Sequence, residues 1–309
     1  GREKVIEVAN ISKRFGEIVA VDSLGFTVNR GEIFGIVGPD GSGKSTLLRM
    51  ISSILVPDRG SITIGGMDVQ KNPIAVKERL AYMPQRFGLY EDLTVEENIF
   101  FFGRLFLLSR REIRNKLDTL YGFSRLGPFK DRLAGKLSGG MKQKLGLVCS
   151  LVHTPEVLLL DEPTNGVDPV SRREFWDILY ELLAKKVTII VTTAYLDEAE
   201  RSNRVALMYR GSFIRLGEPK SVRNEIKQKI LHIVVDNSKK AESILRKVPE
   251  LKIVRTGNSI RMFTDSVHKT RNHVEQLLRP NRVAILSVEE ALPRLEDSFI
   301  EIITREGSQ

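Results

Sequence analysis

The residues with the clearest chemical purpose form a short segment in the N-terminal part of the chain. Residues 38–46 read Gly-Pro-Asp-Gly-Ser-Gly-Lys-Ser-Thr and match the phosphate-loop pattern G-x-x-x-x-G-K-[ST]. Glycines let successive backbone N–H groups curl around a phosphate, while Lys44 could reach the β- and γ-phosphates and the Ser45 hydroxyl could bind Mg²⁺. The segment therefore predicts a nucleotide phosphate site built from Gly38, Pro39, Asp40, Gly41, Ser42, Gly43, Lys44, Ser45 and Thr46.

The segments on either side of this loop distinguish a phosphate site from a glycine-rich turn that matches the pattern by chance. Residues 33–37 are apolar, as in a buried strand, and apolar residues recur at helical spacing after the loop. The helical positions are Leu47, Leu48, Ile51, Ile54 and Leu55. A helix that follows a strand and a loop aims its positive N-terminal end at a bound phosphate. The flanking segments therefore favour the phosphate site.

Two carboxylates follow a second apolar run. Residues 157–160 resemble a buried strand, and Asp161 and Glu162 come directly after them. Ligands of α/β proteins gather at the carboxyl ends of strands, and adjacent strand residues point to opposite sides. We therefore expect Asp161 to hold Mg²⁺ and Glu162 to face an attacking water as a general base.

Three further segments carry weaker signals. Ser138, Gly139 and Gly140 begin an apolar helix that extends to about residue 151 and could offer N–H groups to an anion, although an ordinary capped helix begins in the same way. A short strand over residues 80–85 is ended by a proline, which leaves Gln85 at the start of a loop. Phe15 lies in a polar turn, where its ring could stack on a base or fold back onto the core.

Together these motifs resemble an ABC-type ATPase cassette over roughly residues 4–220. The resemblance rests on the loop at residue 38, on Leu-Ser-Gly-Gly-Met-Lys-Gln from residue 137, and on Leu-Leu-Leu-Asp-Glu-Pro-Thr-Asn-Gly-Val-Asp-Pro from residue 158. It implies an α/β fold of the P-loop NTPase type with an antiparallel β subdomain and an α-helical subdomain over about residues 86–155. It also implies ATPase activity with ATP and Mg²⁺.

The resemblance assigns a role to each matching residue. Phe15 would stack on adenine, and residues 38–46 would be the Walker A loop. Asp161 and Glu162 would form Walker B, with Lys44, Gln85 and Glu162 in the catalytic group and Ser45, Gln85 and Asp161 near Mg²⁺. Ser138, Gly139 and Gly140 would complete the ATP site of an opposite cassette, and Asp168 would be the carboxylate of the loop that faces it.

The resemblance also implies partners. Two cassettes close head to tail over two ATP molecules, either as a homodimer or with a different cassette, and Gln85 passes the movement to separate transmembrane permease subunits. Residues 82–94 and 137–147 resemble the first cassette of tandem ATPases that serve ABC-2-type multidrug exporters. We therefore expect a cytoplasmic protein, peripheral on the inner face of the cell membrane, with no nucleic acid partner.

One position departs from the family pattern. After an apolar run over residues 187–191, the family usually has a histidine that contacts the γ-phosphate, and here the residue is Ala194. By analogy with deletions in oxyanion holes, losing one donor to developing charge costs about 10²–10³ in rate. A degenerate site paired with a competent one is the interpretation we favour, and the alternatives are an introduced His→Ala substitution and replacement of the histidine by another group.

Composition agrees with a soluble protein that does not itself cross a membrane. The 309 residues are 41% hydrophobic and 28% charged with a formal net charge of +9, and the richest apolar stretch is far shorter than a membrane span. The N-terminus lacks the shape of a signal peptide. The single Cys149 excludes an internal disulfide, and we expect a buried thiol. Nucleic acid, anionic lipid and nucleotide would all suit the positive charge.

The chain changes character near residue 220, which predicts a nucleotide-binding domain over residues 1–222 and an accessory or regulatory domain over residues 223–309. The C-terminal part predicts a strand at 231–235, a helix at 239–248, strands at 252–256 and 259–264, a helix at 267–278 and a strand at 283–287. This β-α-β-β-α-β order is the ferredoxin-like plan. A final helix over residues 293–300 resembles the closing motif of drug-exporter ATPases. For this C-terminal part we favour a structural or dimer-stabilising role over a ligand-sensing role.

Three other functions share the motifs. A DNA-repair ATPase would need a long heptad insertion between residues 46 and 137, and a translation-type ATPase would carry two cassettes, but neither feature is present in the sequence. A regulatory cassette that binds ATP and dimerises but hydrolyses very little remains an alternative because of Ala194.

Overall fold

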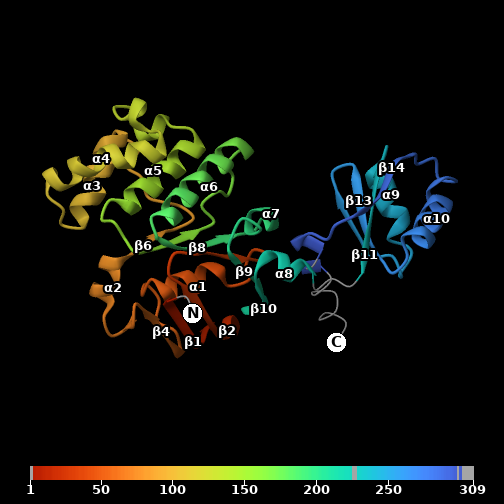
Figure 1. The fold of residues 1–309 in the computed structure, drawn as a ribbon, viewed down its shortest axis with the longest axis horizontal. Coiled ribbons are helices and arrows are strands. Elements are labelled where there is room, and N and C mark those ends of the chain that lie inside the picture. The colour runs from red at the N-terminus through yellow and green to blue at the C-terminus, as the bar shows by residue number, and fades with distance from the viewer. Residues whose placement is uncertain (1–2, 225–227, 298, 301–309) are drawn as a thin grey trace. The chain divides into compact units, whose positions relative to one another are not determined.

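The computed structural model describes residues 3–224, 228–297 and 299–300 (Figure 1). The chain forms two compact units that follow one another in the sequence, with the boundary between Pro219 and Lys220 at the start of helix α8 (Pro219–Asn224). The first unit contains two sheets and the second contains one, and each unit has its own apolar core.

A six-stranded sheet forms the centre of the first unit, in the order β10-β9-β3-β8-β7-β6. Its strands are β3 (Ile33–Val37), β6 (Leu80–Met83), β7 (Val157–Asp161), β8 (Thr188–Thr193), β9 (Arg204–Tyr209) and β10 (Ser212–Gly217). All pairs are parallel except β9 with β10. Every residue of β3, β7 and β8 is buried, as expected of a parallel sheet that is covered on both faces. The carboxyl ends of these three strands therefore meet at one edge.

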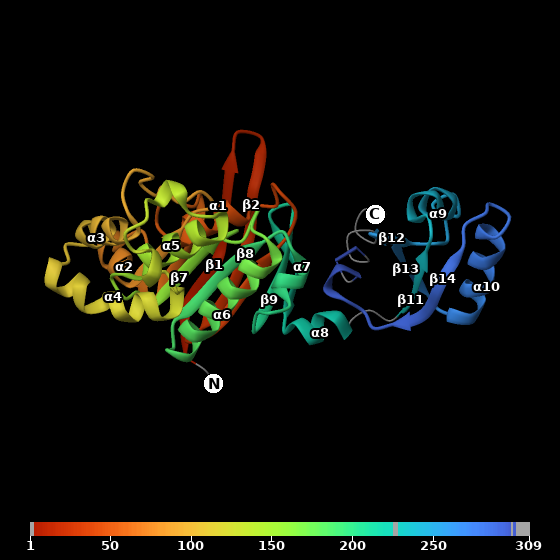
Figure 2. The same cartoon turned by 90° about the horizontal axis from the view of Figure 1, so that it is seen from above.

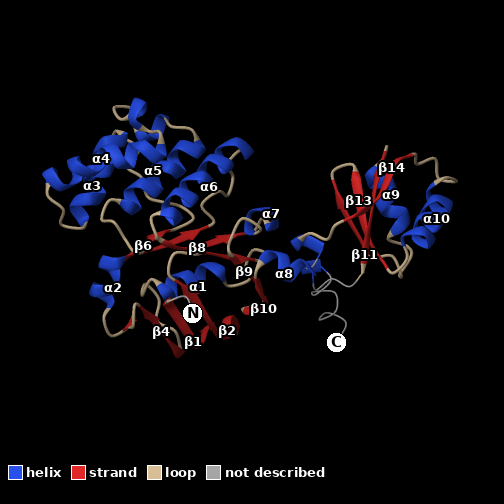
Figure 3. Ribbon diagram, viewed as in Figure 1, coloured by secondary structure: helices blue, strands red, loops and turns tan. Residues whose placement is uncertain are grey.

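Two apolar layers cover this sheet on opposite sides (Figure 3). One contains helices α1 (Lys44–Ile51) and α2 (Pro73–Arg79) and an antiparallel sheet in the order β2-β1-β4-β5. The strands of that sheet are β1 (Lys4–Phe15), β2 (Ile18–Asn29), β4 (Arg59–Ile64) and β5 (Met67–Asp68). The other layer contains α3 (Val95–Leu105), α4 (Arg110–Ser124), α5 (Gly139–Leu151) and α6 (Pro169–Ala184). This is the predicted α/β cassette with an antiparallel β subdomain and a helical subdomain.

The N-terminal strands are longer than the sequence predicts. The apolar runs at residues 18–21 and 26–28 predict two short strands, but they belong to the single strand β2. The polar residues between the runs do not end the strand, because β2 stays paired with β1 through register shifts and Ser23 takes a left-handed backbone with φ of 48°. A bulge of this kind keeps a ladder intact across an irregular stretch.

The helical subdomain begins its helices with strong capping signals. Thr94 and Ser109 each accept a hydrogen bond from the backbone of a glutamate three residues later, and that glutamate accepts one in return. Short 3₁₀ segments at Gly127–Phe129 and Ala134–Lys136 lead into α5. Cys149 on α5 is fully buried, which confirms the predicted buried thiol, and burial raises its pKa. Helix α7 (Leu196–Ala199) follows β8.

The second unit has the predicted ferredoxin-like topology. Its elements are β11 (Lys229–Val235), α9 (Ser238–Leu245), β12 (Ile253–Thr256), β13 (Ser259–Thr264), α10 (Val267–Leu278) and β14 (Ile285–Ala291). The antiparallel sheet has the order β12-β13-β11-β14, and both helices lie on one face of it (Figure 2). The last strand begins and ends later than the predicted 283–287. In the predicted final helix, the described helical residues start at Leu295.

Among the residues that the structure describes, no helix is both long enough and apolar enough to span a membrane.

Candidate nucleotide-binding site

The predicted phosphate loop lies directly after β3, at the edge of the sheet where β7 and β8 also end. A pocket of about 350 Å³ opens beside it. Its lining includes residues that the sequence selected from three separate motifs, together with two apolar residues of β2. They are Asp40, Gly41, Gly43, Lys44, Ser45, Thr46, Gln85, Glu162, Ile18 and Ala20. The fold therefore brings the loop, Gln85 and Glu162 to one pocket.

Two glycines of the loop have no space for a side chain. A Cβ on Gly38 would lie 2.1 Å from the carbonyl oxygen of Met208, and a Cβ on Gly43 would lie 2.2 Å from that of Ala20. Gly43 also has φ of 107°, a conformation that L-residues rarely adopt. Close packing against β9 and β2 thus fixes both ends of the loop and points its intervening backbone at the pocket.

Lys44 is turned into its own loop. Its Nζ donates to the carbonyl oxygens of Gly38 at 2.7 Å and Pro39 at 3.0 Å, and it forms an ion pair with Glu162 at 3.1 Å. The side chains of Lys44 and Glu162 are only 4% and 9% exposed. A phosphate entering the loop would therefore compete with a carboxylate for the ammonium group.

Asp161 sits at the end of β7 within a set of hydroxyl donors. The hydroxyls of Ser45 and Thr192 donate to its Oδ1 at 3.0 Å and 2.9 Å, and Tyr82 donates to its Oδ2 at 3.3 Å. Burial, followed by the charge of Asp161, raises the pKa of Tyr82, so the phenol keeps its proton. The carboxylate is held rigidly with one oxygen next to the Ser45 hydroxyl.

The backbone conformation of Glu162, and not the alternation of side chains along a strand, sets the direction of its side chain. The sequence argument places Asp161 and Glu162 on opposite sides of one strand, but β7 ends at Asp161 and Glu162 has a left-handed φ of 47°. Its carboxylate accepts hydrogen bonds from Gln85 at 3.0 Å and Asn165 at 3.3 Å. The strained backbone, which is common at functional sites, points this carboxylate into the phosphate pocket.

The residues present suit a phosphate and a magnesium ion. Ser42 Oγ is buried and has no hydrogen-bond partner among the described residues, so the loop holds an unused hydroxyl. The Ser45 hydroxyl and the Asp161 carboxylate lie 3.0 Å apart. Mg²⁺ is usually bound by one or two side-chain oxygens together with substrate phosphates, and the described residues contain no cluster of three or more metal-binding side chains. The donor set therefore fits an ion shared with a nucleotide.

Ala194 follows β8 in an exposed position. Beside it, the Thr193 and Thr164 hydroxyls donate to the buried carboxylate of Glu198, with oxygen distances of 2.9 Å and 2.8 Å. Burial raises the pKa of Glu198, while Arg172 approaches the same carboxylate at 3.8 Å. The loop that carries Ala194 is therefore well held, although the alanine itself adds no polar atom to the site.

Besides Gly38, Pro39, Ser42 and Asp161, which lie in or next to the loop, five predicted site residues do not line this pocket. Phe15 lies at the end of β1 and is 48% exposed, with Lys13 Nζ located 5.7 Å from its ring centre. Ser138 caps α5, and Gly139 and Gly140 form its first turn. Asp168 caps α6 by accepting from the backbone of Val170 and Ser171, and these bonds lower its pKa. The structure shows helix-capping roles for Ser138 and Asp168.

Sequence reasoning missed three residues that hold the carboxylates in place. Thr192 binds Asp161 and also accepts from the backbone N–H of Glu162 at 2.9 Å, and Tyr82 and Asn165 each donate to one carboxylate. The only signal for Thr192 is a hydroxyl residue at the end of an apolar strand. Its role depends on the pairing of β7 with β8, which the sequence does not reveal.

The comparisons with known proteins agree with this site. Residues 21–165 match the family described as ABC transporter. The chain is 40% identical over 99% of its length to the probable multidrug ABC transporter ATP-binding protein YbhF of Escherichia coli, but it spans only 53% of that protein. It is 35% identical to the Nod factor export ATP-binding protein I of a Rhizobium strain, with 97% of both chains covered.

A solved structure gives the same result for the fold. The ADP conformation of MJ1267, described as an ATP-binding cassette of an ABC transporter, matches with a TM-score of 0.65 and 28% identity over 71% of this chain and 92% of that one. A full-length relative above 30% identity, the family match and the phosphate-loop geometry lead to one conclusion. The chain belongs to the family of ABC transporter ATP-binding proteins.

Proposed function

We propose that this chain binds and hydrolyses ATP as the motor subunit of an ABC-2-type exporter. The observation that carries the proposal is the meeting of Lys44, Gln85 and Glu162 at one pocket beside the phosphate loop. In this role Lys44 leaves its own loop and binds the β- and γ-phosphates. Glu162 accepts a proton from the water that attacks the γ-phosphorus, and ADP and phosphate are released.

Mg²⁺ belongs to the same proposal. Ser45 and Asp161 would hold it together with phosphate oxygens, and Gln85 would contact it after leaving Glu162. The ion would neutralise charge that develops on the phosphates. Thr192 keeps the Asp161 carboxylate in place throughout.

We assign the remaining predicted residues to a second cassette and to the nucleotide base. Ser138, Gly139 and Gly140 lie at the N-terminal end of α5, where N–H groups and the helix dipole favour an anion supplied by a partner. Asp168 lies on the loop that would face the partner, and Phe15 is exposed enough to stack on adenine. Whether the partner is an identical or a different cassette, and whether the two are tandem, stays a prediction.

Coupling to a membrane subunit would use the segment after Gln85. A hollow of about 330 Å³ is lined by Phe87, Phe102, Phe106 and Leu105, and Leu105 is 61% exposed. We propose that an apolar segment of a permease docks there, which would place the chain peripherally on the cytoplasmic membrane face. Export is supported by the names of the two relatives, a probable multidrug ABC transporter ATP-binding protein and a Nod factor export ATP-binding protein.

The first experiment is Mg²⁺-ATP turnover by the purified chain beside its Ala194→His and Glu162→Gln variants, with nucleotide binding measured separately. A weakened hydrolytic site predicts that Ala194→His raises turnover by about 10-fold or more and that Glu162→Gln removes it. Fast turnover by the unmodified chain with no gain from histidine would show that another group has replaced the histidine. Both the unmodified and the Ala194→His proteins could instead bind nucleotide without turning it over, whether alone or with an added competent cassette. That result would favour the hydrolysis-impaired regulatory cassette.

A further inference from the structure

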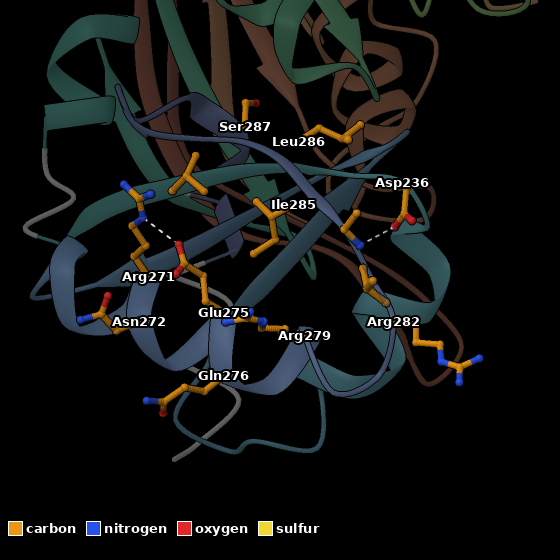
Figure 4. Close-up of a pocket in the computed structure, with 13 residues that line it drawn as sticks. Asp236, Arg271, Asn272, Glu275, Gln276, Arg279, Arg282, Ile285, Leu286 and Ser287 are labelled. Carbon is orange, nitrogen blue, oxygen red and sulfur yellow. Dashed lines mark hydrogen bonds and ion pairs between the residues drawn. The ribbon is translucent and has the colours of Figure 1, made fainter.

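A hollow in the second unit lies between α10 and β14, an edge strand of its sheet. It has a volume of about 920 Å³, which is in the range of ligand sites. One wall consists of polar side chains of α10, and the other is residues 283–288 at the start of β14 (Figure 4). We call this hollow the α10–β14 groove. Neither the proposed ATPase activity nor the cassette motifs use it.

The strand wall offers backbone hydrogen-bonding groups. Within the described sheet, β14 pairs with β11 only, so one row of its N–H and C=O groups faces away from the sheet. Leu286 on this wall is 66% exposed, and the register shift opposite Val234 and Val235 leaves it as the extra residue of a bulge. Six residues of extended chain measure about 20 Å, so the wall matches a peptide of five or six residues.

The end of the helix wall and the turn that follows it supply positive charge that is not used inside the protein. Arg271 forms an ion pair with Glu275 at 2.9 Å, and Asp236, the other acidic residue of the groove, accepts from the backbone N–H of Ala284 (Figure 4). Arg279 and Arg282 have no ion pair with any acidic side chain in the described part of the chain. The groove therefore has both carboxylates engaged and two guanidinium groups available.

We propose that the α10–β14 groove binds an extended acidic peptide segment of a partner protein. The peptide adds to β14 as a fifth strand, and its acidic side chains pair with Arg279 and Arg282. A groove between an edge strand and a helix is the geometry by which several domains bind peptides through main-chain pairing. Guanidinium groups match carboxylates with two parallel hydrogen bonds, which adds specificity to the backbone pairing.

The far end of the strand limits where the acidic residues of the peptide can lie. Glu289 and Glu290 follow the groove on β14 and are engaged by His232 at 3.0 Å and Lys229 at 3.2 Å. Like charges placed opposite one another on neighbouring strands repel. The acidic residues of the peptide therefore lie beside residues 283–288, and the peptide ends before the two glutamates.

The test is fluorescence anisotropy of the full chain with a labelled hexapeptide of alternating glutamate and valine. Two further peptides are compared, one with glutamine for glutamate and one with alternate backbone nitrogens methylated. We expect saturable binding of the acidic peptide, about fivefold weaker binding to Arg279→Gln/Arg282→Gln, and the same affinity for the charge-matched control Lys239→Gln/Lys269→Gln. The control lysines are exposed and lie outside the groove. The glutamine peptide should bind weakly and the methylated one should not bind.

Several results would overturn the proposal. Equal losses in both double variants would show diffuse charge attraction, and undiminished binding of the methylated peptide would exclude strand addition. Failure of the acidic peptide to saturate would exclude the site. The unmodified chain could also self-associate in sedimentation without binding the peptide. If this self-association is lost in Arg279→Gln/Arg282→Gln, the edge of β14 binds a second copy of the chain. Unchanged circular dichroism spectra would establish that the variants fold.

Discussion

The buried ion pair between Arg261 and Asp297 should control the stability of the second unit. Arg261 lies on β13, and its guanidinium donates to both carboxylate oxygens of Asp297 at 3.1 Å and 2.7 Å, and to the carbonyl oxygen of Leu292 at 2.8 Å. The two side chains are 3% and 1% exposed. Removing one partner of such a pair leaves a buried, uncompensated charge and costs about 3–5 kcal/mol. We therefore expect Arg261→Met to destabilise this unit by about 3 kcal/mol, since release of the segment around Asp297 lets the carboxylate reach water.

The distribution of aromatic residues allows this loss to be assigned to one unit. The single Trp and all six Tyr residues precede residue 210, so intrinsic fluorescence reports only the first unit, whereas far-ultraviolet circular dichroism reports both. With a urea dependence of about 1–2 kcal/mol/M for a small domain, the loss moves one dichroism transition about 1.5–3 M lower. The fluorescence transition should stay where it is in the unmodified chain.

Two controls make the reasoning refutable. Replacing both partners by apolar residues, Arg261→Met/Asp297→Leu, should restore most of the lost stability, because no unpaired charge remains. Breaking the exposed ion pair of Arg246 with Glu242 by Arg246→Met should cost under about 1 kcal/mol, because Arg246 is 62% exposed. If Arg261→Met costs no more than Arg246→Met, or if the double variant is as unstable as the single one, the buried pair is not the source of the stability.

Three further predictions concern the first unit. Thr192→Val keeps the shape of the side chain but removes the hydrogen bond to Asp161. Mg²⁺-ATP turnover, measured by steady-state kinetics, should fall by about 10-fold. The melting temperature, measured by calorimetry, should change by only a few degrees. Glu162→Gln removes the ion pair with Lys44, so metal-free ADP should bind severalfold more tightly. Titration calorimetry measures this affinity. An unchanged affinity would show that the ion pair does not oppose nucleotide binding. Burial lowers the pKa of His153, so the unfolded chain takes up a proton at this histidine before the folded chain does as pH falls below about 6.5. The first unit should therefore lose stability between about pH 6.5 and the folded-state pKa of His153. Urea titrations of His153→Phe should no longer show this pH dependence.

The order of elements was predictable because local patterns determine it. The phosphate loop, its strand and its helix could be placed from glycines, one lysine and apolar spacing, and the β-α-β-β-α-β order of the second unit followed from alternating apolar runs. These features depend on residues that are neighbours in the chain. The merged strand β2 was the exception, since pairing with β1 continues through a polar stretch that reads as a break.

Contacts between distant segments could not be predicted in the same way. Arg261 and Asp297 are ordinary charged residues in the sequence, and only the return of residues 292–297 to the sheet makes them a buried pair. The cause of the direction of Glu162 could not be predicted for a related reason. The sequence shows a carboxylate after a strand, but the left-handed φ that turns it toward Lys44 depends on how β7 ends beside β8.

The nucleotide site in this structure is arranged for a charge exchange. Lys44 and Glu162 neutralise each other, Gln85 is bonded to the same carboxylate, and Ser42 has an unused buried hydroxyl. In the proposed function, an arriving triphosphate would bring negative charge to Lys44 and weaken its ion pair with the Glu162 carboxylate, which also accepts from Gln85. This exchange would couple nucleotide binding to the proposed general base and, through Gln85, to the segment that leads to the hollow lined by Phe87. This coupling requires no contribution from position 194, so nucleotide-driven movement and hydrolysis can be separated by the Ala194→His comparison.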